Sequence, residues 1–269
     1  VDKISDLVPL FESIERGDAN AIGRHLANLL DLGSLEINGI AVKDRTLYDS
    51  VYLDSFSIKL GREAKLVNSV DINLTGFEVG TSLLKELDLP PEVLEPLKED
   101  KLKLNASLIS NSDFNISEST GVFSIGFDNL GKFTFEVVQG GYTKDIAYKM
   151  YDIYNEEFIN KLTLKLMKFS FTNEGLIEIL MNEAQKNMNL TPIQMIQMVS
   201  QEIENSGEFL SYDLKEKMKK AVTTFIKSGK SIEISIKSVD KDGVSLDELN
   251  QFFASGLIEN FFELDILAQ

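Results

Sequence analysis

The sequence predicts an α+β protein built on an extended, twisted antiparallel sheet with amphipathic helices packed on one side. Three observations lead to this prediction. Residues 34–141 consist mainly of segments in which apolar and polar residues alternate, as in half-buried strands. The clearest hairpin has alternating runs on both sides of residues 128–131, a loop ending in Gly. Residues 172–229 hold three amphipathic segments, each with its own helix-start signal.

The β-rich section begins after two short helices that are expected within residues 1–33. Strands are expected over residues 35–42, 51–60 and 70–79, then near 102–108, 114–116, 123–127 and 133–137. The alternation changes parity at Asn38-Gly39, and the second strand shows the same shift, which indicates bulges. Residues 81–100 are a helical interruption of this section, since Pro90-Pro91 and Pro96 limit short helices there.

The second half is expected to be helical with flanking strands. A helix is predicted over residues 142–160 and strands over 162–171, 232–239 and 261–266. Three helices begin at Thr172-Asn173, at Thr191 and at Asp213, and the last of them ends at Gly229. A further capping box, Ser245 with Glu248, opens a helix that ends at Gly256.

These elements divide the chain into three sections. They are the N-terminal helices at 1–33, the β-rich section at 34–141 with its interruption at 81–100, and the helical section with flanking strands at 142–269. A chain of 269 residues accommodates one continuous domain or two tightly packed halves.

Composition excludes several functions. The formal charge of −16 opposes nucleic-acid binding, because such binding needs clustered Lys and Arg. There is no Cys, so the chain can form neither a thiolate site nor a disulfide. No apolar run approaches the roughly 18 residues of a transmembrane segment. The first residue is Val, which fits a processed or a trimmed chain, and we expect a periplasmic protein whose export signal has been removed.

Catalytic and metal-binding motifs fail when their spacing is checked. Gly229-Lys-Ser leaves a helix and enters a strand, the reverse of a phosphate-binding loop. The acids around Gly243 resemble a calcium loop, but its first and last ligand positions would be Ser238 and Leu249. His25 is the only histidine and lies in an N-terminal helix pattern, which argues against a Ser-His-Asp triad and against His-based metal sites. We therefore predict no catalytic residue, no metal ligand and no cofactor.

The methionines are the candidate site residues. Five of the seven lie in the helical stretch, and they are Met181, Met188, Met195, Met198 and Met218. Met is an adaptable core filler, and this is the more ordinary interpretation. The functional interpretation is a groove for an apolar ligand or a partner helix, because Met-rich surfaces re-pack around different shapes.

The chain also resembles known proteins. The Leu-x-Leu-x-Leu strand at 162–166, the Thr191-Pro192 helix start and the Ser228-Gly229-Lys-Ser-Ile-Glu-Ile return are similar to those of exported alphaproteobacterial proteins without assigned function. Residues 101–137 also resemble them. More distantly, the β-rich repetition is similar to envelope proteins of the AsmA or tubular lipid-binding kind. That resemblance implies a curved sheet that shelters an apolar channel.

Together these features predict a non-enzymatic envelope binding protein. Its ligand would be apolar or lipid-like, or its partner would be another envelope protein, because reactive residues are few whereas Phe-rich strands and the Met cluster are plentiful. Two alternatives remain. One is a carboxylate-dependent hydrolase, since some close pair among 43 acids is expected by chance. The other is an architectural subunit of an envelope complex.

Overall fold

The structure is a computed structural model of the whole chain. It describes residues 33–43, 50–63, 66–80, 101–149, 160–205, 210–245, 247–249 and 258–269. The helices predicted before residue 33, the interruption predicted at 81–100 and most of the helix predicted after Ser245 lie outside the described residues.

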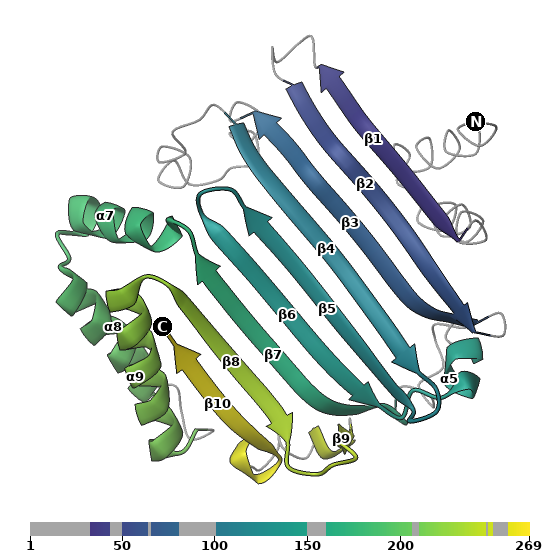
Figure 1. Cartoon of the computed structure of the whole chain (residues 1–269). Coiled ribbons are helices and arrows are strands. Elements are labelled where there is room, and N and C mark those ends of the chain that lie inside the picture. The colour runs from purple at the N-terminus through teal and green to yellow at the C-terminus, as the bar shows by residue number, and fades with distance from the viewer. Residues whose placement is uncertain are drawn as a thin grey trace.

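A single ten-stranded antiparallel sheet dominates the described chain (Figure 1). Its order is β1-β2-β3-β4-β5-β6-β7-β8-β10, with the short strand β9 paired to β7, so nearly every strand lies beside its neighbour in sequence. The strands are β1 (Ser34–Lys43), β2 (Ser50–Glu63), β3 (Leu66–Gly80), β4 (Lys101–Asp113), β5 (Glu118–Phe127), β6 (Gly131–Gly140), β7 (Thr163–Asn173), β8 (Ser231–Ser238), β9 (Val244–Ser245) and β10 (Phe262–Ala268).

The described helices gather near two parts of this sheet. Helices α7 (Leu176–Met188), α8 (Pro192–Asn205) and α9 (Tyr212–Ser228) lie beside the β8–β10 end, where α9 contacts both strands and α8 contacts α9 (Figure 1). The short helix α5 (Lys144–Lys149) contacts β3, and a 3₁₀ turn, η2 (Ile258–Asn260), precedes β10. The structure is therefore a mixed α+β arrangement in which antiparallel sheet dominates, as the sequence predicts.

The parity changes predicted at Asn38-Gly39 and in the second strand fall where residues are skipped in the strand pairing. Asn38 pairs with Ser55 and Ile40 pairs with Leu53, so the β1–β2 register skips Gly39 and Asp54 and is otherwise unbroken. A register shift occurs between β3 and β4, where Leu74 and Phe77 are the successive partners of Ala106 and Leu104. The extra residue that this shift leaves in β3 is a β-bulge.

Glycine occupies one of the skipped positions in β1 and the bulge in β3. Gly39 has φ +68° and Gly76 has φ +61°, a left-handed conformation that L side chains adopt at a cost. At Gly76 a Cβ atom would also meet the Asp54 side chain. The Asn-Gly and Thr-Gly positions in the sequence therefore mark where the strands bend.

Two element predictions are wrong. Phe114 and Ile116 do not belong to a strand, because they lie in the turn between β4 and β5. In that turn the Asp113 carboxylate accepts the Asn115 backbone N–H (2.9 Å), and Ser117 has φ +55°. Phe114 is instead buried and stacks on Tyr142 with ring centroids 6.0 Å apart.

The second correction concerns the starts of α7 and α9. Helix α7 begins at Leu176, whereas the predicted start, Thr172-Asn173, forms the end of β7. The predicted cap Asp213 lies in the first turn of the helix, and Ser211 is the N-cap. The Ser211 hydroxyl accepts the Leu214 backbone N–H at 3.3 Å. The capping boxes at Thr191 and Ser245 are confirmed, since each cap exchanges hydrogen bonds with the residue three positions later, Gln194 and Glu248.

Candidate apolar binding face

The strand register separates the sheet into an apolar face and a polar face. Residues directly opposite each other in paired strands project to the same side. One continuous row crosses nine strands in this way, and we call it the central apolar row. Its members are Leu35, Ile58, Ile72, Leu108, Phe123, Phe135, Phe169, Ile234 and Ile266. Every position in the row is a large hydrophobic residue.

The middle of this row is open. Exposed fractions are 40% for Leu108, 43% for Phe123, 37% for Phe135 and 39% for Phe169. These residues lie on four adjacent strands, β4 to β7, which places them at a spacing of about 4.8 Å. Single exposed hydrophobic residues are ordinary on protein surfaces, whereas these four are neighbours on adjacent strands, which makes them the candidate binding surface.

Helix α9 covers the neighbouring part of the same face. Phe225 of α9 meets Phe171 of β7 edge to face, with centroids 5.9 Å apart, and Phe171 stacks against Phe133 at 4.4 Å. Phe171 is only 5% exposed. Phe169, two residues earlier on the same strand and face, is 39% exposed. The part of the face that α9 covers therefore ends between Phe171 and Phe169.

The opposite face is polar and carries ion pairs between strands. Lys103 of β4 donates to Asp54 of β2 at 3.3 Å, and Lys168 of β7 pairs with Glu233 of β8 at 2.9 Å. The hydrogen bond to Asp54 raises the pKa of Lys103, and the bond to Glu233 raises the pKa of Lys168. One face of the sheet therefore carries charged pairs between strands, and the other carries the central apolar row.

The predicted methionines are distributed over three helices. Met181 and Met188 lie on α7, Met195 and Met198 on α8, and Met218 on α9. Met188 and Met198 are exposed, whereas the other three are half-buried. Helices α8 and α9 contact each other, which brings two of the three helices together. A ligand role for these five residues remains a prediction.

The exposed part of the central apolar row is the site feature that could not be predicted from the sequence. Each strand of the row was predicted from its alternation, and the Phe content was evident. The side-by-side placement of Phe123, Phe135 and Phe169 depends on strand order and register. Only the hairpin loop at 128–131 gave part of that information, for the β5–β6 pair.

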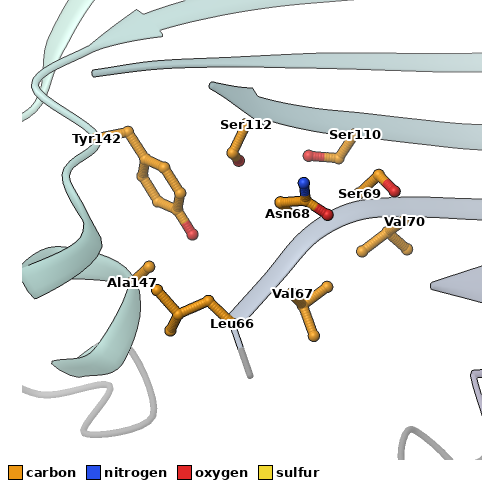
Figure 2. Close-up of a pocket in the computed structure, with 9 residues that line it drawn as sticks. All are labelled: Leu66, Val67, Asn68, Ser69, Val70, Ser110, Ser112, Tyr142 and Ala147. Atoms are coloured by element: carbon orange, nitrogen blue, oxygen red, sulfur yellow. The ribbon is translucent and has the colours of Figure 1, made fainter. Parts of the chain in front are cut away.

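A small pocket lies at one end of the apolar face, and we call it the end pocket (Figure 2). Its volume is about 190 Å³, and its lining combines apolar side chains with amide and hydroxyl groups. Figure 2 shows Tyr142 projecting into the space between Ala147, Leu66 and the serines of β4. The lining residues are Leu66, Val67, Asn68, Ser69, Val70, Ser110, Ser112, Tyr142 and Ala147.

Strands β3 and β4 form the floor of the end pocket, and a buried apolar cluster forms its wall. Val70 of β3 pairs with Ser110 of β4, two residues along the strands from the pair Ile72–Leu108 of the central apolar row. Leu66, Phe114 and Ala147 form a buried cluster with Tyr142 packed against it. That cluster closes the pocket on the side away from the row.

A second pocket of about 300 Å³ lies over β3 to β6 and has a more polar lining. It includes Ser107 and Ser124, whose hydroxyls are 2.8 Å apart, and the acids Asp128 and Glu174. Asn105 donates to Asp128 at 3.4 Å and accepts the Gly76 backbone N–H at 2.8 Å. Asp128 and Glu174 are the carboxylates among the residues that line this pocket.

General acid catalysis needs a carboxyl with a raised pKa. The described carboxyls with displaced values are Glu204, Glu248 and Glu259, and all three are lowered. Lys219 lowers the pKa of Glu204 by a hydrogen bond and its charge, and the Ser245 backbone N–H and hydroxyl lower that of Glu248. None of the three residues lines the second pocket. The carboxylate-dependent hydrolase remains a prediction.

Two further findings concern the described part of the chain. No group of three or more His, Cys, Asp or Glu residues there is arranged to hold a metal ion. In the same residues no helix has the length and hydrophobicity needed to cross a membrane.

Comparison with known proteins adds a family without assigned function. A family described as "Uncharacterized protein" matches residues 124–257, which include β6, β7, β8 and the three helices α7 to α9. No curated protein matches the chain.

Proposed function

We propose that this chain is a non-enzymatic binding protein of the bacterial envelope that takes up an apolar or lipid-like ligand on the open part of its sheet. The exposed run of Leu108, Phe123, Phe135 and Phe169 is the observation that supports this proposal most directly. In this proposal the helices shield one side of the sheet near β8 and β10, and the ligand occupies the rest of that side.

The size of the open row suits a hydrocarbon chain. Four strands at about 4.8 Å give a row about 14 Å long, which continues over β3 and β8 as Ile72 and Ile234. An aromatic side chain presents about 200 Å² of surface, so three Phe and one Leu that are about 40% exposed leave about 300 Å² to cover. At about 25 cal/mol per Å² this area would supply roughly 7 kcal/mol before the costs of binding.

The polar face supports the same assignment. Its ion-paired cations and its serine and asparagine side chains suit contact with water, and the formal charge of −16 opposes adsorption of the protein on an anionic membrane surface. An apolar ligand taken up one molecule at a time needs no such adsorption. The resemblance to envelope proteins of lipid-binding type agrees with a periplasmic location.

A specific test is to extract the purified protein with organic solvent and analyse the extract by mass spectrometry. The proposal expects a copurifying lipid or binding of a neutral fluorescent probe such as 1-N-phenylnaphthylamine, with affinity in the micromolar range or better. If no lipid copurifies and the probe does not bind, the lipid-ligand proposal is wrong. The envelope protein partner and the architectural subunit would then be the remaining candidates, and light scattering would show whether the chain forms an oligomer.

A further inference from the structure

We infer that the end pocket holds the uncharged polar headgroup of a single-chain amphiphile whose hydrocarbon tail lies along the central apolar row. This inference rests on the proposed function and specifies its ligand class. It commits to one occupant, a neutral amphiphile such as a monoacylglycerol, in which hydroxyl groups are joined to one acyl chain.

The pocket and the row form one continuous surface. Val70 and Ser110, which line the pocket, pair with each other two residues along their strands from Ile72 and Leu108. Positions two residues apart in a strand lie on the same face at about 7 Å. A tail leaving the pocket past Val70 would therefore meet the row at Leu108 and continue to Phe123.

The lining groups suit hydrogen bonding to a hydroxylated headgroup. Asn68 offers an amide with donors and an acceptor, and Ser110 offers a hydroxyl. Ser112 donates its hydroxyl hydrogen to Ser119 at 3.1 Å, so its oxygen can still accept a bond from a ligand. The Tyr142 ring stacks on Phe114, which fixes the direction in which its hydroxyl enters the pocket (Figure 2).

Charge selects a neutral headgroup over an anionic one. None of the residues that line the end pocket carries a formal charge. Lys144, which lies over the Phe114 ring, is already paired with Glu63 at 2.6 Å. With a net charge of −16, the protein as a whole also repels anions. An ionised carboxylate or phosphate would lose its hydration in this pocket and gain no cation in exchange.

The volume of the end pocket is large enough for the headgroup and too small for the whole ligand. Pockets that enclose a whole drug-sized ligand measure about 300–1,000 Å³. The end pocket, at about 190 Å³, fits only a smaller polar fragment. The remainder of the ligand must lie outside the pocket, and the adjoining apolar surface is the open row.

The test compares two ligands with the same sixteen-carbon chain, monopalmitoylglycerol and palmitic acid at pH 8, as competitors of bound 1-N-phenylnaphthylamine. Each competitor is used below the concentration at which it aggregates. The wild-type protein should bind the neutral ligand at least tenfold more tightly than the anionic one. Tyr142→Phe keeps the stacked ring and removes only the hydroxyl, and Ser112→Ala removes a hydroxyl. Each should weaken monopalmitoylglycerol about three- to tenfold.

The probe and palmitic acid should bind these two variants as they bind the wild type. Ser107→Ala is the matched control, because Ser107 lies on the same strand as Ser112 but lines the second pocket on the polar face. Equal affinity for the two ligands, or a preference for the anion, would overturn the headgroup inference while the proposed function stands. A wild-type protein that does not bind the probe would overturn both.

Discussion

Two adjacent residues of β4 provide a matched test of which face of the sheet binds the apolar ligand. Leu108 and Ile109 are both 40% exposed, and they project to opposite faces because they are neighbours in one strand. Leu108 belongs to the central apolar row, whereas Ile109 lies between Asp71 and Val122 on the polar face. Thr is a suitable replacement for both, since its β-branched side chain fits a strand. The change removes apolar surface and little else.

The expected loss of affinity follows from the exposed fraction. Complete burial of a Leu side chain supplies about 1.5–3 kcal/mol, so covering the exposed 40% of Leu108 supplies about 0.6–1.2 kcal/mol. Leu108→Thr should therefore weaken an apolar ligand about three- to eightfold. For Phe123, 43% of an aromatic surface of about 200 Å² corresponds to about 2 kcal/mol. Phe123→Thr should then weaken the ligand about thirtyfold.

The assay is a titration of 1-N-phenylnaphthylamine with each purified variant, combined with urea unfolding. Ile109→Thr should bind the probe as the wild type does, and it should lose about as much unfolding free energy as Leu108→Thr, because the two side chains are equally exposed. Equal weakening in the Leu108 and Ile109 variants would refute the assignment of the ligand to the apolar face. Weakening in Ile109→Thr alone would place the ligand on the polar face.

Two further predictions concern helix starts. Ser211→Ala should lower the unfolding free energy measured in urea by about 1 kcal/mol, because it removes the acceptor of the Leu214 N–H. Asp213→Ala should lower it by less than about 0.5 kcal/mol. A larger loss in Asp213→Ala than in Ser211→Ala would contradict the assigned cap. The Ser245 backbone N–H and hydroxyl lower the pKa of Glu248. The ionised Glu248 carboxylate therefore stabilises the folded state above the unfolded pKa near 4.5, and this stabilisation is lost as pH falls through the folded pKa. In an NMR titration the Glu248 carboxyl should show a midpoint below 4.5 that rises in Ser245→Ala, and an unchanged midpoint would rule out this bond as the cause.

Much of the fold could be predicted because its signals are local. Alternation predicted the strands around residues 37, 72, 125 and 234, and the parity change at Asn38-Gly39 predicted an irregularity where Gly39 has positive φ. Helix caps were readable where a hydroxyl residue stands three positions before Glu or Gln. Each of these signals acts over a few residues of chain.

The errors arose where a local signal was ambiguous. Phe114 and Ile116 alternate like strand residues, yet the Asp113 side chain organises a turn there, and Phe114 is buried by Tyr142 from beyond β6. Near α9 both Ser211 and Asp213 are good caps, and the sequence offers no means of choosing between them. Contacts between distant segments settled both cases. In the second, the Glu259 carboxylate accepts the Ser211 backbone N–H at 3.1 Å.

The candidate site was harder to predict for the same reason. The Met cluster is visible in the sequence because its members lie close together along the chain. The members of the exposed row are Leu108, Phe123, Phe135 and Phe169, which span 62 positions of the sequence. Their proximity depends on the order and the register of four strands together. A site formed across strands leaves no compact motif.

Helix α9 shows what an occupant of the open row has to provide. Phe171 and Phe169 lie on one strand and one face, and Phe171 is the less exposed because Phe225 packs on it and Phe133 lies closer to it. The covered position gains an edge-to-face aromatic contact and loses its water, which are the gains that make aromatic burial favourable. The uncovered position has the same chemistry and the same strand geometry. Whatever binds there must therefore be apolar, and it must reach across strands as Phe225 does from the helix.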